Sequence, residues 1–325
     1  MRTIQDVSAS DSGQLSPGSP AILLHGLDAR LEKHGELEPV VHVYNWVAET
    51  RARLSSTIAN KSAILSPLGG LSYSPFEHRG WLSKLRKRCH DRPARRATVI
   101  AAYNESEARH LRENNVHPRV EVLPIGIDTK EYSPVVTLRQ SLAPKQAGRM
   151  ILYLGPIHPR EGLVPFLKAF AELGPAAEGW NVVLAGPATP TWRGKIEAAI
   201  QRKGGGERVT FHDAPDLPAQ LSLLAQADIL VCPALQHRCP TSIMQALASG
   251  VPVVATEPVA PDGVGDAMVV CRPSRDELRE SLRSVLTMSD DQRRALGQRG
   301  LAWVRANADW SVLVDRYVAL YQSLV

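Results

Sequence analysis

The stretch CPALQHRCPTSIMQALASGVPVVAT, residues 232–256, decides the fold. It begins at the end of the apolar run Asp228–Pro233, continues through the helix-patterned segment Ser242–Ser249 and ends in the β-branched run Pro252–Thr256. Gly250 follows the helical segment directly, where a left-handed C-cap favours glycine. A strand, a helix and a second strand joined by such short loops predict a right-handed βαβ unit.

The same alternation continues on both sides of this stretch. Further strands are expected at Met150–Gly155, Asn181–Gly186, Val209–Asp213 and Met268–Cys271, with helices at Leu163–Leu173 and Leu217–Ala227. These strands are almost wholly apolar, as strands buried on both faces of a parallel sheet must be. Gly155 and Gly186 each end a strand at the carboxyl edge, which is where ligands bind in a doubly wound sheet.

The first half of the chain predicts a second, shorter α/β unit. Its strands are expected at Ala21–His25, Val41–Asn45, Ala63–Ser66, Thr98–Ala102 and Val120–Pro124, and its helices at Val47–Ala59, Trp81–Cys89 and Glu105–Asn114. A length of 325 residues exceeds what one core usually supports. We therefore predict a disordered tail over 1–18, one domain over 19–138, a second over 149–309 and a final helix over 310–325, with a linker at Thr129–Gly148.

Composition excludes several classes of protein. No apolar run approaches the roughly 18 residues that span a bilayer, and residues 1–18 lack the apolar core of a signal peptide. The four cysteines have neither metal-ligand nor disulfide-framework spacing, so we expect no metal site and a cytoplasmic location.

The net charge of +5 is unevenly spread, because residues 79–96 carry eight cationic side chains and one acidic side chain. One interpretation is a helix with an apolar face toward the core and a solvated cationic face. The other is a dock on the inner membrane surface, suited to a lipid-linked acceptor. No nucleic-acid partner is expected, since no aromatic stacking platform accompanies the charge.

Six stretches together resemble the family-4 (group 1) glycosyltransferases. Residues 154–162 stand where that family has a Gly-Arg turn and a Pro-x-Lys-Gly motif, and residues 232–256 stand where it has two glutamates eight positions apart. Looser matches occur at Val41–Tyr44, Ser66–Gly70, Leu123–Asp128 and Trp310–Ser311. The resemblance covers roughly residues 40–325 and implies a GT-B fold. In that fold two Rossmann-like doubly wound domains face a cleft, here with a shortened N-terminal domain, and the last helix crosses back to it.

The resemblance also implies a chemistry. It implies a retaining transferase that moves a sugar from a UDP- or GDP-sugar to a glycan or lipid-linked acceptor in cell-envelope polysaccharide biosynthesis, with no cofactor. In such enzymes an Arg, a Lys and helix N-terminal amides neutralise the donor diphosphate, and charge grows on that group as the anomeric bond breaks.

The family's functional positions are substituted in this chain. Pro156 and Glu161 replace the Arg and the Lys, and His237 and Gln245 replace the two glutamates. In the first domain, Tyr44 replaces the second His of a His-x-His strand. The front of the chain is short as well, with about forty residues before Val41 and no visible Gly-Gly loop.

We carry the resemblance onto the residues that could still act. His237 is the candidate catalytic group, since an imidazole can serve as a donor or a base. The candidate donor-binding residues are Gly155, Arg160, Arg238, Thr241, Ser242 and Gln245, and the candidate acceptor-side residues are Tyr44, Leu68 and Gly69.

Three functions compete at this point. The first is the active transferase. The second is a catalytically silent relative that binds nucleotide or glycan, or stabilises a partner. The third is a GT-B sugar-nucleotide epimerase, which is disfavoured because its acid and base carboxylates cannot be placed in the cleft.

Overall fold

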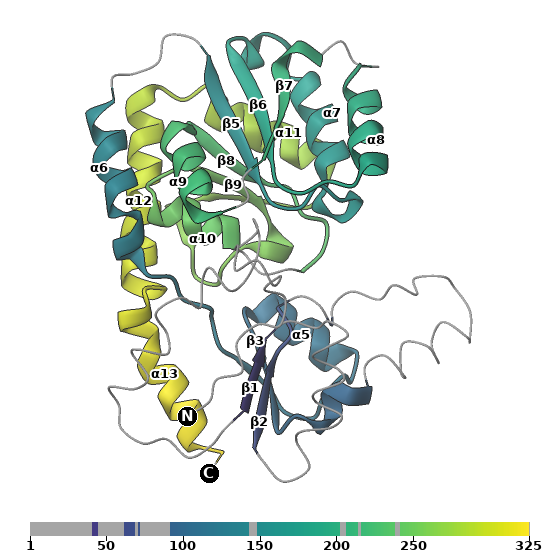
Figure 1. Ribbon diagram of the computed structural model, residues 1–325, viewed down its shortest axis with the longest axis vertical. Coiled ribbons are helices and arrows are strands. Elements are labelled where there is room, and N and C mark those ends of the chain that lie inside the picture. Colours follow the sequence, from purple (N-terminus) through teal and green to yellow (C-terminus); the bar gives the residue numbers. More distant parts are fainter. Residues whose placement is uncertain are drawn as a thin grey trace.

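The computed structural model describes residues 41–44, 62–68, 71, 92–142, 148–201, 206–213, 216–237 and 241–324. They form two units, each built on its own parallel sheet, with the last two helices running one after the other along one side (Figure 1). The tail 1–18, the strand predicted at Ala21–His25, the helices predicted at Val47–Ala59 and Trp81–Cys89, Gly69, Arg238 and most of the basic segment lie outside the described residues. Within the described ranges, no helix is long and apolar enough to cross a bilayer.

The C-terminal sheet has six parallel strands in the order β10-β9-β8-β5-β6-β7. They are β5 (Arg149–Leu154), β6 (Trp180–Ala185), β7 (Val209–His212), β8 (Ile229–Cys232), β9 (Val253–Thr256) and β10 (Val269–Cys271). The six strands predicted from apolar runs are therefore confirmed to within a residue at each end. The chain builds outward from β5 to β6 and β7, then returns to β8 on the other side of β5 and builds outward to β10. The order of the sheet thus reverses between β5 and β8.

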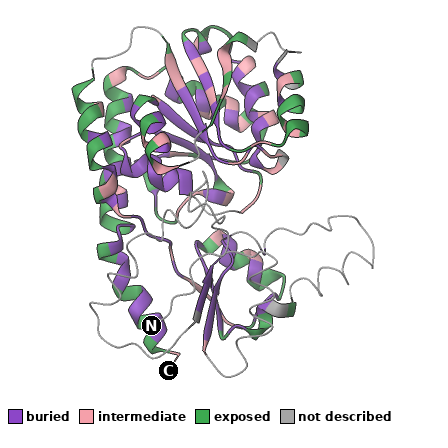
Figure 2. Cartoon of the chain, in the orientation of Figure 1, coloured by how far each residue is buried: buried purple, intermediate pink, exposed green. Residues whose placement is uncertain are grey.

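Helices cover both faces of this sheet. On one face α7 (Leu163–Ala171), α8 (Pro190–Gln201) and α11 (Arg275–Leu286) pack on the strand residues that include Ile151 and Tyr153. On the other face α9 (Leu217–Gln226) and α10 (Thr241–Ala248) pack on the strand residues that include Leu152 and Leu154, and α12 (Asp290–Asn307) packs on α10. Consecutive residues of β5 are thus buried on opposite faces, as expected for a strand inside a doubly wound sheet, and β8 and β9 are buried along their whole length (Figure 2). The edge strands β7 and β10 are only partly buried.

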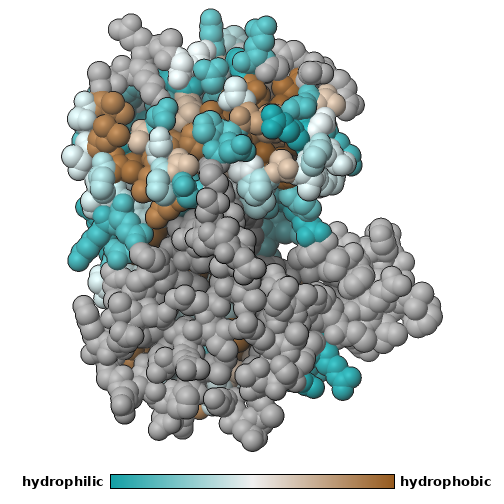
Figure 3. Space-filling view, in the orientation of Figure 1, coloured by the Kyte–Doolittle hydropathy of each residue, from teal (hydrophilic) through white to brown (hydrophobic). Residues whose placement is uncertain are grey.

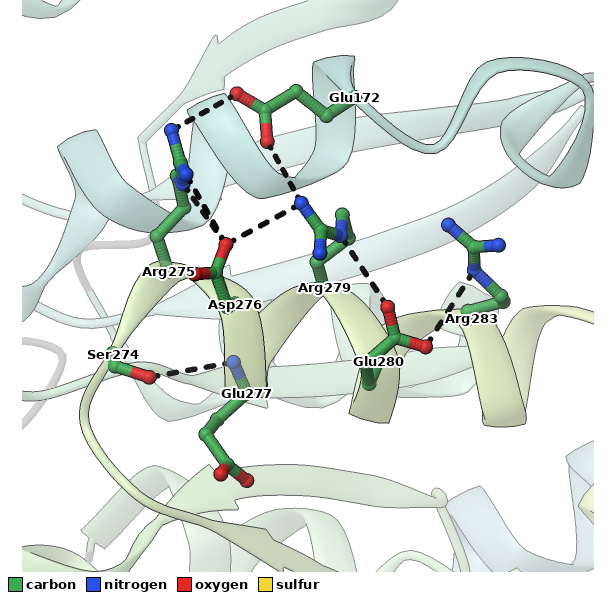
Figure 4. A network of polar contacts seen from close by, with 8 residues as sticks. All are labelled: Glu172, Ser274, Arg275, Asp276, Glu277, Arg279, Glu280 and Arg283. Carbon is green, nitrogen blue, oxygen red and sulfur yellow. Dashed lines mark hydrogen bonds and ion pairs between the residues drawn. The ribbon is translucent and has the colours of Figure 1, made fainter.

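An ionic network joins α7 to α11 on the surface of this unit (Figure 4). The Glu172 carboxylate, just after α7, pairs with Arg275 and Arg279 of α11, each at 3.4 Å. Arg279 also pairs with Asp276 at 3.3 Å and with Glu280 at 3.4 Å. Figure 3 shows apolar residues interspersed with polar ones over the visible face of the C-terminal unit.

The N-terminal sheet has four described strands in the order β1-β2-β3-β4, all parallel. They are β1 (Val41–Tyr44), β2 (Ala63–Ser66), β3 (Val99–Ala102) and β4 (Val120–Val122). Helix α5 (Glu105–Glu113) follows β3, and its first turn is capped by the Asn104 side chain, which accepts from the Glu107 amide at 2.7 Å. The strands predicted here at residues 41–45, 63–66, 98–102 and 120–124 are confirmed, with ends that differ by up to two residues.

The segment predicted as a linker, Thr129–Gly148, is helical over residues 129–141, which form most of its described part. A 3-10 helix (Thr129–Tyr132) leads into α6 (Ser133–Ser141), which buries Val135 and Val136 and packs on α9. The Arg139 guanidinium of α6 donates to the Leu224 carbonyl near the end of α9 at 3.1 Å and also to the Ala227 carbonyl. Proline within the first helical turn starts α6 instead of breaking it.

Helix α13 (Trp310–Gln322) leaves the C-terminal unit and packs on the N-terminal one (Figure 1). The Tyr317 hydroxyl donates to the Pro124 carbonyl at 3.0 Å, and the Tyr321 hydroxyl lies 2.8 Å from Nδ1 of His42. The chain crosses between the units where Ile127 and Asp309 form an isolated parallel bridge. A Cβ at Gly126 would lie 2.7 Å from the Trp310 ring, so only glycine lets the crossing chain approach this closely.

Candidate functional site

The loop after β5 opens the candidate site at the reversal point of the sheet. It runs from Gly155 to Gly162 and lies at the carboxyl edge, where doubly wound sheets bind ligands. Gly186, which ends β6, has a φ of +142°, and a Cβ there would meet the Gly155 carbonyl oxygen at 2.2 Å. Two of the glycines singled out from sequence therefore permit close backbone packing at this edge.

The loops after β5 and β8 touch each other. The Leu235 amide donates to the Arg160 carbonyl at 3.0 Å. Gly162 adopts a φ of +67°, and a Cβ at this position would lie 1.8 Å from the Pro233 carbonyl oxygen. The structure thus brings Gly155, Arg160 and the loop leading to His237 together across the reversal point.

Arg160 supplies positive charge at this edge. Its side chain is half-buried, and partial burial lowers the pKa of the guanidinium from its usual value. The guanidinium remains charged at neutral pH because the ordinary value is far above 7. Beside it, burial lowers the pKa of His158, whose ring lies 5.9 Å from that of Trp192 on α8. The adjacent Glu161 is buried at 9% exposure, so the substituted lysine position has become a largely covered carboxylate.

Helix α10 begins at the same edge with Thr241, four residues after His237 in the sequence. Thr241 and Ser242 form its first turn and are 0% and 3% exposed. Their backbone amides carry the partial positive charge of a helix N-terminus, which favours anions. Cys232, at the end of β8, is fully buried, and burial raises the pKa of its thiol to about 12, so this cysteine is an unreactive core group.

His237 lies where the two units meet. Its Nδ1–H donates to the Pro258 carbonyl oxygen at 3.1 Å, and its ring lies 5.6 Å from that of His110 on α5 of the N-terminal unit. Burial lowers the pKa of His237, and the neighbouring His110 lowers it further, whereas the Pro258 carbonyl acts in the opposite direction. His237 is therefore neutral at pH 7, with Nε2 as an acceptor.

Gln245 does not face the cleft. Its side chain is 0% exposed, and its Nε2–H donates to Gln220 Oε1 of α9 at 3.0 Å. The helix turns this residue toward α9, so a bound nucleotide could reach it only after rearrangement of that contact. Gln245 is thus separated from Arg160 and His237, with which the sequence grouped it.

Tyr44 and Leu68 lie at the carboxyl ends of β1 and β2 and are 2% and 6% exposed. Tyr44 stacks on His42 at 4.1 Å between ring centroids. Both residues belong to the core that also receives α13. Neither offers side-chain surface to an acceptor in this arrangement of the two units.

The carboxyl edges of the two sheets face each other through contacts that the sequence did not reveal. Tyr103, which follows β3, donates its hydroxyl to the Pro258 carbonyl at 2.8 Å, and Asn104 Nδ2–H donates to the Ala260 carbonyl at 3.0 Å. The Glu105 amide donates to the Asp262 carboxylate at 2.7 Å. The sequence could have indicated Tyr103, Asn104 and Glu105 only by their position, because they directly follow the carboxyl end of a predicted strand. Across the described part of the chain, no group of three His, Cys, Asp or Glu side chains could hold a metal ion.

Comparisons with known proteins identify what this arrangement resembles. Residues 148–288 match the family model for group 1 glycosyl transferases. One relative is a GDP-mannose-dependent monoacylated alpha-(1-6)-phosphatidylinositol monomannoside mannosyltransferase of Corynebacterium glutamicum. The two sequences are 28% identical over 226 residues, and this alignment covers 64% of this chain and 57% of that protein. A second relative is a D-inositol 3-phosphate glycosyltransferase of Segniliparus rotundus. It is 26% identical to this chain over 235 residues, and the alignment covers 69% of this chain and 52% of that protein. The chain thus spans little more than half the length of these two relatives.

The fold is shared with solved structures. The sucrose-phosphate synthase of Thermosynechococcus elongatus superposes with a TM-score of 0.72 at 21% identity, covering 94% of this chain and 77% of that one. This likeness extends over both units and supports a GT-B arrangement of two facing sheets, as the sequence predicted.

Proposed function

We propose that this chain, which belongs to the group 1 glycosyl transferases through residues 148–288, transfers a sugar from a nucleotide-sugar donor to a glycan or lipid-linked acceptor with retention of configuration. One observation carries the proposal. Arg160 and the first amides of α10 lie at the same edge of the C-terminal sheet, at its reversal point. The Arg160 carbonyl accepts a hydrogen bond from the Leu235 amide in the loop that leads to His237. A diphosphate bound there would meet positive potential from both sources.

In this proposal each residue has a limited role. Arg160 neutralises charge that grows on the leaving diphosphate, which stabilises the transition state more than the ground state. The α10 amides donate to phosphate oxygens. The neutral His237 accepts a hydrogen bond from a hydroxyl of the transferred sugar through Nε2. The donor is a UDP- or GDP-sugar.

A second candidate is a catalytically silent relative that binds a nucleotide or a glycan, or stabilises a partner, without transferring sugar. It is favoured by Gln245, which is fully buried against Gln220 at the position where the family has its second glutamate. It is also favoured by Glu161, because an anion near a diphosphate opposes binding of the donor by an amount on the order of a few kcal/mol at an effective dielectric near 20.

We also propose that the basic segment 79–96 docks on a membrane surface. Of that segment, the structure describes only Arg92–Arg96.

Calorimetric titration of UDP, GDP and their sugars, combined with assays of sugar transfer, tests the proposal. Arg160→Ala should weaken binding of the diphosphate by about 10- to 100-fold, because a hydrogen bond to a charged group contributes about 1.5–3 kcal/mol. Lys168→Ala is the matched control, since it removes one cation from the exposed side of α7. Equal affinities for wild type and Arg160→Ala would contradict the assigned site.

The variant Glu161→Lys separates the two candidates. It restores a cation at the position where the family has lysine. Turnover by the wild-type chain supports transfer. If nucleotide binds only after the substitution, the wild-type chain is not an active transferase.

A further inference from the structure

The carbonyl oxygen of Pro258 accepts hydrogen bonds from both halves of the molecule. Tyr103 Oη–H of the N-terminal unit donates to it at 2.8 Å, and His237 Nδ1–H of the C-terminal unit donates at 3.1 Å. Pro258 lies in the short 3-10 helix Glu257–Val259 that directly follows β9. A single acceptor therefore joins the domain interface to the candidate catalytic histidine.

Two donors on one carbonyl influence each other. The oxygen has two lone pairs and can accept both bonds, but each donor draws electron density from it and weakens it as an acceptor for the other. The proton on Nδ1 of His237 is held in place by this bond, which leaves the lone pair on Nε2. Any change in the Tyr103 contact therefore changes the field at the imidazole through the shared carbonyl oxygen.

The Tyr103 contact depends on how the two units are seated. The three consecutive residues Tyr103, Asn104 and Glu105 each donate to the segment Pro258–Asp262. Tyr103 is 4% exposed, so its hydroxyl has little access to water as an alternative partner. A rotation that separates the units must break these bonds together.

We propose that Tyr103 is a positioning residue that couples the seating of the N-terminal unit to the proton placement and orientation of His237 through the shared Pro258 carbonyl. The catalytic consequence rests on the proposed function, because it requires His237 to contact the transferred sugar. The coupling itself does not, since it can be measured in the free protein. Among the described residues, the titratable side chain that faces the His237 ring from the other unit is His110.

The test measures the titration of His237 by nuclear magnetic resonance in protein labelled at histidine. The chain has 10 histidines, and the His237 signal is assigned by its loss in His237→Gln. In Tyr103→Phe the pKa of His237 should rise by about 0.5 to 1 pH unit, because the freed carbonyl then stabilises the imidazolium more strongly. An unchanged His237 titration in this variant would overturn the proposal.

Two controls identify the cause of the rise. Tyr317→Phe removes a tyrosine hydroxyl from a different proline carbonyl, that of Pro124, and should leave the His237 titration unchanged. Asn104→Ser removes the amide donor to the Ala260 carbonyl but keeps a capping hydroxyl for α5 and leaves Pro258 untouched, and it should also leave the titration unchanged. An equal rise in Asn104→Ser would assign the effect to loosened domains and would refute coupling through the carbonyl.

Measurements of sugar transfer then distinguish a failure of the positioning role from a failure of the proposed function. If the wild-type chain transfers sugar, Tyr103→Phe should displace the pH profile of kcat/KM, which reports the pKa values of the free enzyme, by the same amount as the His237 titration. A kcat/KM profile that does not move, despite a moved titration, would refute the positioning role. If the wild-type chain shows no transfer, the proposed function fails, while the titration still decides whether Tyr103 and His237 are coupled.

Discussion

His42 makes the stability of the N-terminal unit depend on pH. It is 0% exposed, its Nδ1 lies 2.8 Å from the Tyr321 hydroxyl, and its Nε2 lies 2.8 Å from the Ser66 hydroxyl. Burial lowers the pKa of this imidazole from 6.5 to about 3. The neutral ring satisfies both contacts, with Nε2–H donating to Ser66 and Nδ1 accepting from Tyr321.

The sign follows from proton linkage. Below pH 6.5 the unfolded state binds a proton at His42 and the folded state does not, until the pH approaches the folded pKa of about 3. The contribution of His42 is therefore fully present above pH 6.5 and is lost as the pH falls toward 3. At pH 5 the loss is about 2 kcal/mol, since each pKa unit corresponds to about 1.4 kcal/mol.

Hydrogen exchange of the β2 amides measures this loss, because it reports the opening of one sheet without treating two domains as a single transition. Between pH 7.5 and pH 5, after correction for the intrinsic exchange rate, the opening free energy of wild type should fall by about 2 kcal/mol more than that of His42→Gln. The variant His212→Gln is the control, since His212 ends β7 of the other sheet. Equal pH dependence in wild type and His42→Gln would show that protonation of His42 does not control the opening of this sheet.

Three further predictions concern backbone and charge. Gly162→Ala should destabilise the C-terminal unit by at least about 1–2 kcal/mol in denaturant unfolding, because φ is +67° and a Cβ would meet the Pro233 carbonyl at 1.8 Å; an unchanged midpoint would show that this loop is not fixed. Asp309→Ala should lower the free energy of unfolding by about 1–2 kcal/mol, because the carboxylate caps α13 and accepts from the Thr129 hydroxyl at 2.6 Å. A smaller loss than in the matched surface variant Asp315→Ala would contradict this role. Glu172→Gln should lower the free energy of unfolding by only about 0.5–1 kcal/mol, because its arginine partners lie on the surface, and high salt should abolish this loss. A loss that persists in high salt would refute an ionic origin.

Most of the C-terminal sheet could be predicted because its strands are continuous apolar runs that end at glycine or a turn. The helix α6 could not be predicted in the same way. Pro134 and the nearby glycine indicated a linker, whereas the buried pair Val135 and Val136 packs on α9 and makes the segment helical. The deciding contact is with a helix that lies about eighty residues later in the chain.

The candidate site was predictable in its place but not in its details. The carboxyl edge and the positions of Arg160 and His237 followed from the strand ends. The burial of Gln245 did not, because a one-residue difference in helix rotation decides between the cleft and α9. The shared carbonyl of Pro258 depends on three segments that meet only in the folded chain, so local pattern could not reveal it.

Hydrogen exchange in the presence of UDP or GDP shows whether a nucleotide diphosphate binds at the reversal point between β5 and β8. We expect at least one of these ligands to slow exchange in residues 155–163 and 241–248 and to leave the distant surface of α11 unaffected. Protection confined to other segments, or no protection by either ligand at saturating concentration, would contradict it.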